Sequence, residues 1–146
     1  MDNSKKTKRK ILVTQALPYA NAPLHLGHIL EAVQTDIWTR FQNFSGNDCL
    51  FFCADDTHGT PVMLKANEMG IKPEKLISDV YIDHKSTYEL YGINFANFYS
   101  THSDENKEFS EYIYKCAKEN NLISKMNIDQ LYDENCLLYT SPSPRD

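Results

Sequence analysis

The sequence predicts an α/β fold built on a parallel sheet, and three observations predict it. The run "ILVTQ" at 11–15 is rich in β-branched residues and free of charge, as strands of parallel sheets are. An amphipathic helical pattern follows from Leu26, and a second uncharged run, "CLFFCA" at 49–54, comes after it. A strand, a helix of about 18 residues and a strand form one βαβ unit, whose strands are parallel and whose crossover is right-handed.

The first strand is expected to be covered on both faces, because it carries no charged side chain. The segment "ALPYANAP" at 16–23 then predicts a loop, since it holds two prolines and an asparagine. The helix after this loop has one apolar stripe and is closed by Gly46 past its end. The stripe consists of Leu26, Ile29, Leu30, Val33, Ile37, Trp38 and Phe41. We expect Ile29, Val33 and Trp38 to lie in the core.

The second strand places Cys49, Phe51 and Cys53 on one face, which predicts buried thiols in a reducing compartment. The remaining cysteines are Cys116 and Cys136, and no two cysteines form a Cys-x-x-Cys pair. The cysteine spacing therefore predicts no zinc knuckle.

The later elements follow from the same patterns. "DDTHGTP" at 55–61 predicts a loop, and Pro61 suits the first turn of a helix over about 61–69. Helices are also predicted over about 74–91 and about 104–120, the second with Asp104 in its N-terminal cap region and Glu105 in its first turn. "FANFYS" at 95–100 predicts a strand, and "LISKMNIDQLYD" at 122–133 predicts another. The segment "CLLYTSPSPRD" at 136–146 has no periodicity and predicts a disordered tail.

Length and composition set the class of protein. The chain has 146 residues, enough for one domain, and its 41% hydrophobic and 24% charged residues are typical of a soluble globular protein. It has neither an apolar run long enough to span a membrane nor a secretory signal, so we expect a cytoplasmic location. Residues 1–9 predict a basic, disordered arm, or a weak contact with RNA or another polyanion. The net charge of −5 argues against a general nucleic-acid binder.

Two loops are predicted to form one site. Ligands of open α/β sheets bind outside the carboxyl ends of the strands, so the loops 16–28 and 55–61 are expected to face each other. His25 and His28 lie on one side of the first helical turn, where backbone N–H groups and Gly27 favour a phosphate. Two alternatives remain open: a metal site, with His58, Asp55 or Asp56 as a third ligand, or histidines that only cap the helix.

The second loop begins with two carboxylates. The side chains of Asp55 and Asp56 are expected to point to opposite sides, one toward the cleft, where it would hold a ligand's ammonium group. The alternative is that both aspartates only cap the turn. Leu17 and Tyr19 flank Pro18 at the end of the first strand, and they either form a pocket for a small apolar amino acid or belong to the core.

Three segments resemble the start of the class I methionine–tRNA ligases, which are class I aminoacyl-tRNA synthetases. The segments are "KILVTQALPYANAPLHLGH", "CADDTHGTPV" and "STHSDENKEFSEYIY", and His25-Leu26-Gly27-His28 matches the His-x-Gly-His signature of the family. The resemblance runs from about Lys10 to Asn135. It implies a Rossmann-like catalytic domain that uses ATP to form methionyl-adenylate and then transfers the methionyl group to tRNA(Met).

The resemblance also implies roles for residues. His25 and His28 would be catalytic, because they would stabilise the phosphates during adenylate formation. The ATP site would comprise Pro18, Tyr19, His25, Gly27 and His28. The methionine site would comprise Leu17, Tyr19 and Asp56. Mg²⁺ would travel with ATP, no protein metal site is expected in this chain, and His58 and His102 receive no role.

Later parts of the family pattern are absent from the sequence. Family members continue into an insertion that often carries a zinc knuckle, the second half of the sheet, a lysine-rich Lys-x-Ser-Lys-Ser loop and an anticodon-binding domain. We therefore expect residues 10–135 to be the N-terminal half of a truncated catalytic domain, inactive alone, with zinc confined to a longer parent. Residues 136–146 are expected to be a tail outside the family, similar to translated adapter sequence and so a sequencing artefact. The alternatives are a small nucleotidyltransferase of the same superfamily, a metal hydrolase and a non-catalytic truncated module.

Overall fold

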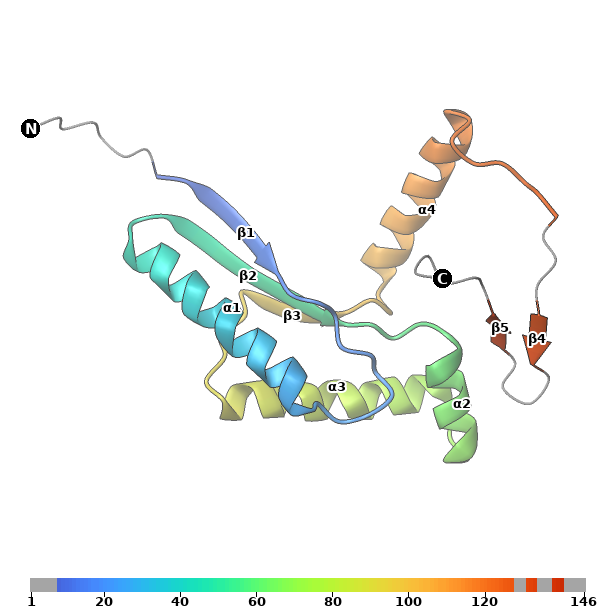
Figure 1. Cartoon of the computed structure of the whole chain (residues 1–146), viewed down its shortest axis with the longest axis horizontal. Helices are drawn as coiled ribbons and strands as arrows, with labels where there is room; N and C mark the ends of the chain where they lie inside the picture. Colours follow the sequence, from blue (N-terminus) through green and yellow to red (C-terminus); the bar gives the residue numbers. More distant parts are fainter. Residues whose placement is uncertain (1–7, 128–130, 134–137, 141–146) are drawn as a thin grey trace, which may run out of the picture.

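The structure is a computed structural model that describes residues 8–127, 131–133 and 138–140. Every predicted helix and strand of the α/β pattern is confirmed to within a few residues (Figure 1). The elements are β1 (Lys10–Thr14), α1 (Leu26–Phe44), β2 (Asp48–Asp55), α2 (Thr60–Glu68), α3 (Pro73–Leu90), β3 (Asn97–Ser100), α4 (Asp104–Glu119), β4 (Leu131–Asp133) and β5 (Leu138–Thr140).

The main sheet is parallel, as predicted. Its strand order is β1-β2-β3, with Leu12 opposite Leu50 and Ala54 opposite Tyr99. α1 connects the first two strands, and α2 and α3 connect the second pair, so the carboxyl ends of all three strands lie at one edge. This edge is where an open α/β sheet binds its ligands.

One face of the sheet carries the core. Phe51 and Cys53 of β2 are buried with Ile29 and Ala32 of α1 and Tyr88 of α3, which shows that both helices pack on this face. Phe98 of β3 completes the cluster, and its ring lies 5.5 Å from that of Tyr88 in an edge-to-face arrangement. The predicted burial of Cys49 and Cys53 is confirmed, and both are free thiols.

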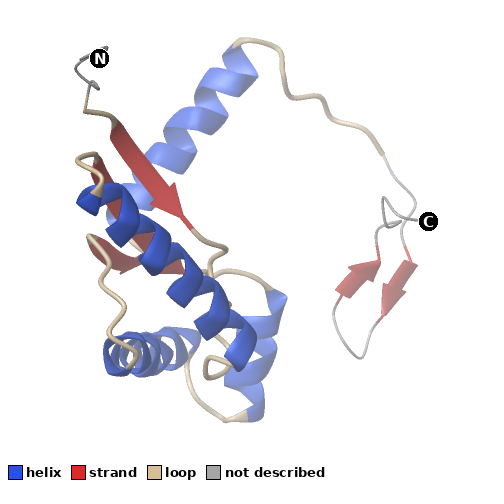
Figure 2. Cartoon of the chain, turned by 60° about the vertical axis from the view of Figure 1, so that its left-hand side comes forward, coloured by secondary structure: helices blue, strands red, loops and turns tan. Residues whose placement is uncertain are grey.

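The opposite face of the sheet is open. Leu12 is 70% exposed, and Leu50 and Tyr99 are each 47% exposed. The expectation that the first strand is covered on both faces is therefore wrong for this structure. The reason is that α1 and α3 both cover the other face, while α4 extends away from the sheet (Figures 1 and 2).

The side of α1 that is buried differs from the apolar stripe predicted from the sequence. Ile29 is buried and Val33 packs against the core as expected, but Trp38 is 41% exposed, so its predicted burial is wrong. Asp36 takes the inward position instead: it accepts a hydrogen bond from the Asn94 N–H at 3.2 Å and pairs with Arg40 at 2.6 Å. The hydrogen bond between Asp36 and Asn94 joins α1 to the loop between α3 and β3, and it holds this side of α1 inward.

The helix ends differ little from expectation. Gly46 follows α1 with φ of 88°, as its place past the helix end predicts. The cap of α4 is Ser103, whose hydroxyl accepts from the Asn106 N–H at 3.2 Å, one residue earlier than the predicted Asp104; Asp104 and Glu105 lie in the first turn. Among the described residues, no helix is long and apolar enough to cross a membrane.

The C-terminal segment contains two short strands. β4 lies in the segment predicted to hold a strand, and it pairs antiparallel with β5. The prediction of a disordered tail is wrong for 138–140, because these residues form β5. Most of the predicted arm 1–9, the rest of the tail 136–146 and Cys136 lie outside the described residues.

Candidate active site

The two predicted loops meet at the carboxyl edge of the sheet. The Ala20 N–H donates to the Asp56 carbonyl at 2.9 Å, and the Asp56 N–H donates to the Pro18 carbonyl at 2.8 Å. Tyr19 and Asp56 thereby pair like neighbours in a parallel sheet. The expectation that these loops face each other is confirmed, and Asp56 is held beside Tyr19 by backbone contacts alone.

The histidine pair caps α1. Nδ1 of His25 accepts from the Gly27 N–H at 3.1 Å, and Nδ1 of His28 accepts from the His25 N–H at 3.3 Å. The two rings stack with their centroids 3.7 Å apart. Because each Nδ1 is an acceptor, the neutral rings carry their proton on Nε2. The hydrogen bonds agree with the capping alternative, and among the described residues neither Nε2–H group has a partner.

His28 is held in its neutral form. Partial burial lowers the pKa of His28, and the neighbouring rings of His25 and His84 lower it further. A neutral ring still donates from Nε2, and it does so beside the free N–H groups and positive end of the α1 dipole. This combination suits an anionic ligand whose charge rises during a reaction.

Gly27 makes the stacked arrangement possible. A Cβ at this position would lie 2.9 Å from Cε1 and 3.0 Å from Nδ1 of His25, closer than van der Waals contact permits. A side chain here would therefore push the His25 ring off its cap. This adds a second reason for glycine to the one expected from sequence, which is close approach of a ligand to the backbone.

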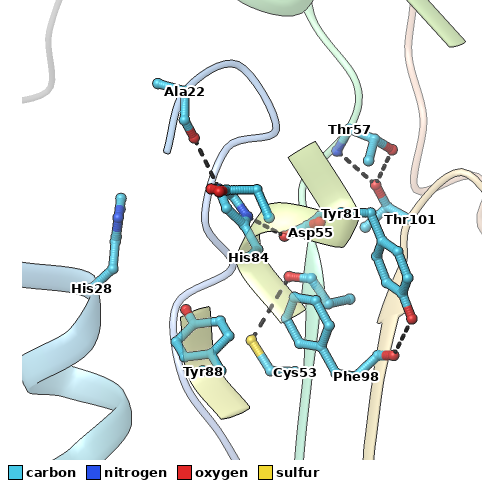
Figure 3. Close-up of polar contacts among 12 residues, drawn as sticks. Ala22, His28, Cys53, Asp55, Thr57, Tyr81, His84, Tyr88, Phe98 and Thr101 are labelled. Carbon is cyan, nitrogen blue, oxygen red and sulfur yellow. Dashed lines mark hydrogen bonds and ion pairs between the residues drawn. The ribbon is translucent and has the colours of Figure 1, made fainter. Parts of the chain in front are cut away.

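The two aspartates differ in burial and in their partners. Asp55 is fully buried and its Oδ1 lies 2.7 Å from Nδ1 of His84, whereas Asp56 is half-buried in the loop. Nε2 of His84 lies 2.8 Å from the carbonyl oxygen of Ala22 (Figure 3). The alternative in which both aspartates only cap the turn is wrong for Asp55, because its partner is a buried histidine from α3.

His84 is a charged member of this group. Burial opposes protonation, but the hydrogen bonds to Asp55 and to the Ala22 carbonyl raise the pKa of His84 above its ordinary value. Both ring nitrogens face oxygen acceptors, so the doubly protonated imidazolium satisfies both contacts. The sequence analysis predicted the helix over about 74–91 and gave His84 no role; a titratable residue at an inward position of this helix was the available signal.

The other candidate residues take varied positions. Leu17 and Tyr19 are 41% and 47% exposed, so they do not belong to the core, while Pro18 between them is buried. His58 lies with His102, 5.5 Å between ring centroids, beside a groove of about 680 Å³ at the start of α4. Within the described part of the chain, no three His, Cys, Asp or Glu residues are placed to hold a metal ion.

Solved structures of tRNA synthetases resemble this chain. Two structures of Mycobacterium tuberculosis methionyl-tRNA synthetase with methionyl-adenylate match at 26% and 28% identity with TM-scores of 0.75 and 0.71, over 78% of this chain. The ternary complex of Agrobacterium radiobacter K84 agnB2 LeuRS with tRNA and LeuAMS matches over 81% of this chain at 23% identity and a TM-score of 0.74, which shows the shared fold. The chain spans 22% of the two Mycobacterium proteins and 15% of the LeuRS.

A family comparison covers nearly the whole sequence. The model of the family described as tRNA synthetases class I (M) matches residues 11–143, a range that contains the parallel sheet, the histidine pair and both loops. The sheet with its connecting helices is accordingly part of a Rossmann-like catalytic domain. The chain belongs to the class I tRNA synthetases.

Proposed function

We propose that this chain supplies the nucleotide- and amino-acid-binding loops of an enzyme that activates methionine with ATP and transfers it to tRNA(Met). The observation that carries the proposal is that His25 and His28 each use Nδ1 on the backbone at the N-terminus of α1, where Nε2–H of each ring has no partner among the described residues. The choice of methionine is supported by the segments "TQALPYAN" and "ADDTHGTP" and by the two methionyl-adenylate complexes.

The histidines act by hydrogen bonding in the activation step. A carboxylate oxygen of methionine attacks the α-phosphorus of ATP, the bond from that phosphorus to the bridging oxygen breaks, and pyrophosphate leaves. Negative charge increases on phosphate oxygens, where the Nε2–H groups of His25 and His28 and the first N–H groups of α1 donate. The terminal ribose hydroxyl of the tRNA then attacks the carbonyl carbon of the adenylate, and AMP leaves.

The second loop would select the amino acid. The Asp56 carboxylate would hold the ammonium group, and the exposed side chains of Leu17 and Tyr19 would contact the methionine side chain. Pro18, Tyr19 and Gly27 would lie against the nucleotide. Mg²⁺ would reach the site on the phosphates of ATP, where it neutralises charge, and we place the reaction in the cytoplasm.

The test measures binding by this chain. A non-hydrolysable methionyl-adenylate analogue is titrated against the wild-type chain and the double variant H25N/H28Q. Asn at the N-cap and Gln three residues later keep a capping box, so this variant removes the ring donors while it preserves the helix start. We expect the double variant to bind about tenfold or more weakly, because charge-assisted hydrogen bonds to a phosphate are lost.

A second comparison tests whether the site selects methionine. The leucyl-adenylate analogue should bind the wild-type chain more weakly than the methionyl analogue, and D56N should weaken both while leaving AMP binding unchanged. Equal affinity for the two analogues would contradict methionine selectivity. Unchanged affinity of H25N/H28Q would contradict the phosphate role of the histidines.

A further inference from the structure

We propose that His84 is a positioning residue whose buried ring holds both loops of the candidate site in place. The proposal rests on the proposed function, because it assigns the support of that same site. One imidazole joins α3 to the loop that leads into His25 and to the strand end that leads into Asp56 (Figure 3).

The contacts lie directly next to the residues that would touch the ligand. Ala22, whose carbonyl oxygen accepts from Nε2 of His84, is three residues before His25. Asp55, whose Oδ1 accepts from Nδ1, is the neighbour of Asp56. A shift of the ring would therefore move the histidine pair and the ammonium-binding carboxylate together.

Burial makes this contact rigid. The side chains of His84 and Asp55 are both 0% exposed, so water does not compete for either hydrogen bond. Imidazolium is the side chain that offers two donors on opposite sides of a rigid ring, whereas an amide group in its place satisfies one acceptor. The second Asp55 oxygen has no hydrogen-bond partner among the described residues, so the carboxylate depends on His84.

α3 is itself fixed to the sheet on both sides of His84. One turn later, the Tyr88 hydroxyl accepts from Nε2 of Gln15, the residue that follows β1. One turn earlier, the Tyr81 hydroxyl donates to the Phe98 carbonyl of β3 at 3.0 Å. The ring of His84 thus stands on a helix whose position is set by β1 and β3, and it transmits that position to the two loops.

The test uses the whole chain with ¹⁵N-labelled histidine and three variants. H84N keeps a donor near Asp55, and H84Q keeps one near Ala22. Y81F is the matched control, because it removes a partly buried hydrogen bond from the same helix, while the contact between Tyr88 and Gln15 still holds α3 against β1. The readouts are the ring resonances of His25 and His28 and amide hydrogen exchange over 20–27 and at Asp56. Thermal unfolding, measured in parallel, identifies any variant that fails to fold.

We expect wild-type His84 to show protons on both ring nitrogens. In H84N, the His25 and His28 rings should shift and the amides over 20–27 should exchange faster, and H84Q should restore part of this loss. Y81F should lower stability and leave these resonances unchanged. The proposal is overturned if H84N and H84Q change the loop signals no more than Y81F does at a comparable loss of stability.

Binding of the methionyl-adenylate analogue provides a second readout. H84N should bind it about tenfold more weakly, because small displacements of positioned groups cost one to two orders of magnitude. Y81F should bind like the wild type, and equal affinity of H84N and Y81F would count against positioning. If the wild-type chain does not bind the analogue, the proposed function fails, while the ring and amide signals still decide the role of His84.

Discussion

The histidines at the start of α1 and the histidine of α3 contact the same loop in different ways. His25 and His28 each use one ring nitrogen on the backbone, and among the described residues the other has no hydrogen-bond partner. His84 uses both nitrogens on the chain and is fully buried. His25 and His28 therefore each keep one ring nitrogen for a ligand, whereas His84 keeps none and acts as a support.

The surroundings of His28 and His84 also shift their pKa values in opposite directions. Burial and neighbouring histidine rings lower the pKa of His28, so this ring is a neutral donor. Burial lowers the pKa of His84, but the Asp55 carboxylate and the Ala22 carbonyl raise it above its ordinary value. The fold thus combines a buried histidine whose two nitrogens face oxygen acceptors with two histidines that each use one nitrogen on the backbone.

The largest effect is expected from removing the buried ring. H84A leaves the Asp55 carboxylate buried without a partner, which should lower the free energy of unfolding by about 3–5 kcal/mol. Urea denaturation of the chain measures the loss. The double variant H84L/D55L removes both charges and should recover a large part of it, and a loss in H84A below about 1 kcal/mol, the level of an exposed ion pair, would contradict the role given to this contact.

A pH series should separate the two kinds of histidine by sign. The raised pKa of His84 gives stability that is complete below about pH 6.5, the unfolded value, and is lost as the pH rises through the folded pKa. The lowered pKa of His28 gives the opposite: stability present above about pH 6.5 is lost as the pH falls through its folded pKa. Asp55, Asp83 and His28 are the titratable groups that act on His84.

Unfolding midpoints measured across this range check the prediction. H84N should flatten the alkaline side of the stability profile, and it should weaken the acid slope only in part, because His84 is one of the groups that lower the pKa of His28. H28Q should flatten the acid side alone. A single variant that removed both slopes would show that one histidine, and not two with opposite shifts, governs the profile.

The local elements were predictable from sequence, because periodicity and capping act within a few residues. Strand ends and the parallel order also placed the loops 16–28 and 55–61 at one edge correctly. The exposure of Trp38 was not predictable. An apolar stripe shows which side of a helix can be buried, but it does not show which residues of the stripe other elements of the chain cover. In this structure Asp36 took the inward position through a contact with Asn94, 58 residues away.

The support of the site was also beyond sequence reasoning. His84 meets Asp55 across 29 residues and Ala22 across 62. Neither spacing belongs to a local motif, so the pair follows only from the packing of α3 beneath the sheet edge. The adjacent carboxylates at the end of β2 indicated a carboxylate at the cleft or at the turn, and neither interpretation included the buried contact of Asp55 with His84.

A smaller effect on stability is expected from G27A. The new Cβ would meet the His25 ring at 2.9 Å and displace it from its cap, while alanine favours the helical backbone by about 1 kcal/mol over glycine. The free energy of unfolding should therefore change by less than about 1 kcal/mol, with the ring resonances of His25 and His28 shifted strongly. Unshifted rings in G27A would show that the stack does not need a glycine at this position.

An effect of similar size concerns the cap itself, and it tests whether His25 serves the helix or the ligand. H25A removes the side-chain acceptor for the Gly27 N–H and should cost about 1 kcal/mol, whereas H25N preserves an acceptor and should cost only a few tenths. Urea denaturation of the two variants measures the difference. If capping were the whole role of His25, H25N would also keep wild-type affinity for the methionyl-adenylate analogue. We expect it to lose affinity while it keeps stability, because asparagine replaces Nδ1 as an acceptor but offers nothing at the position of Nε2.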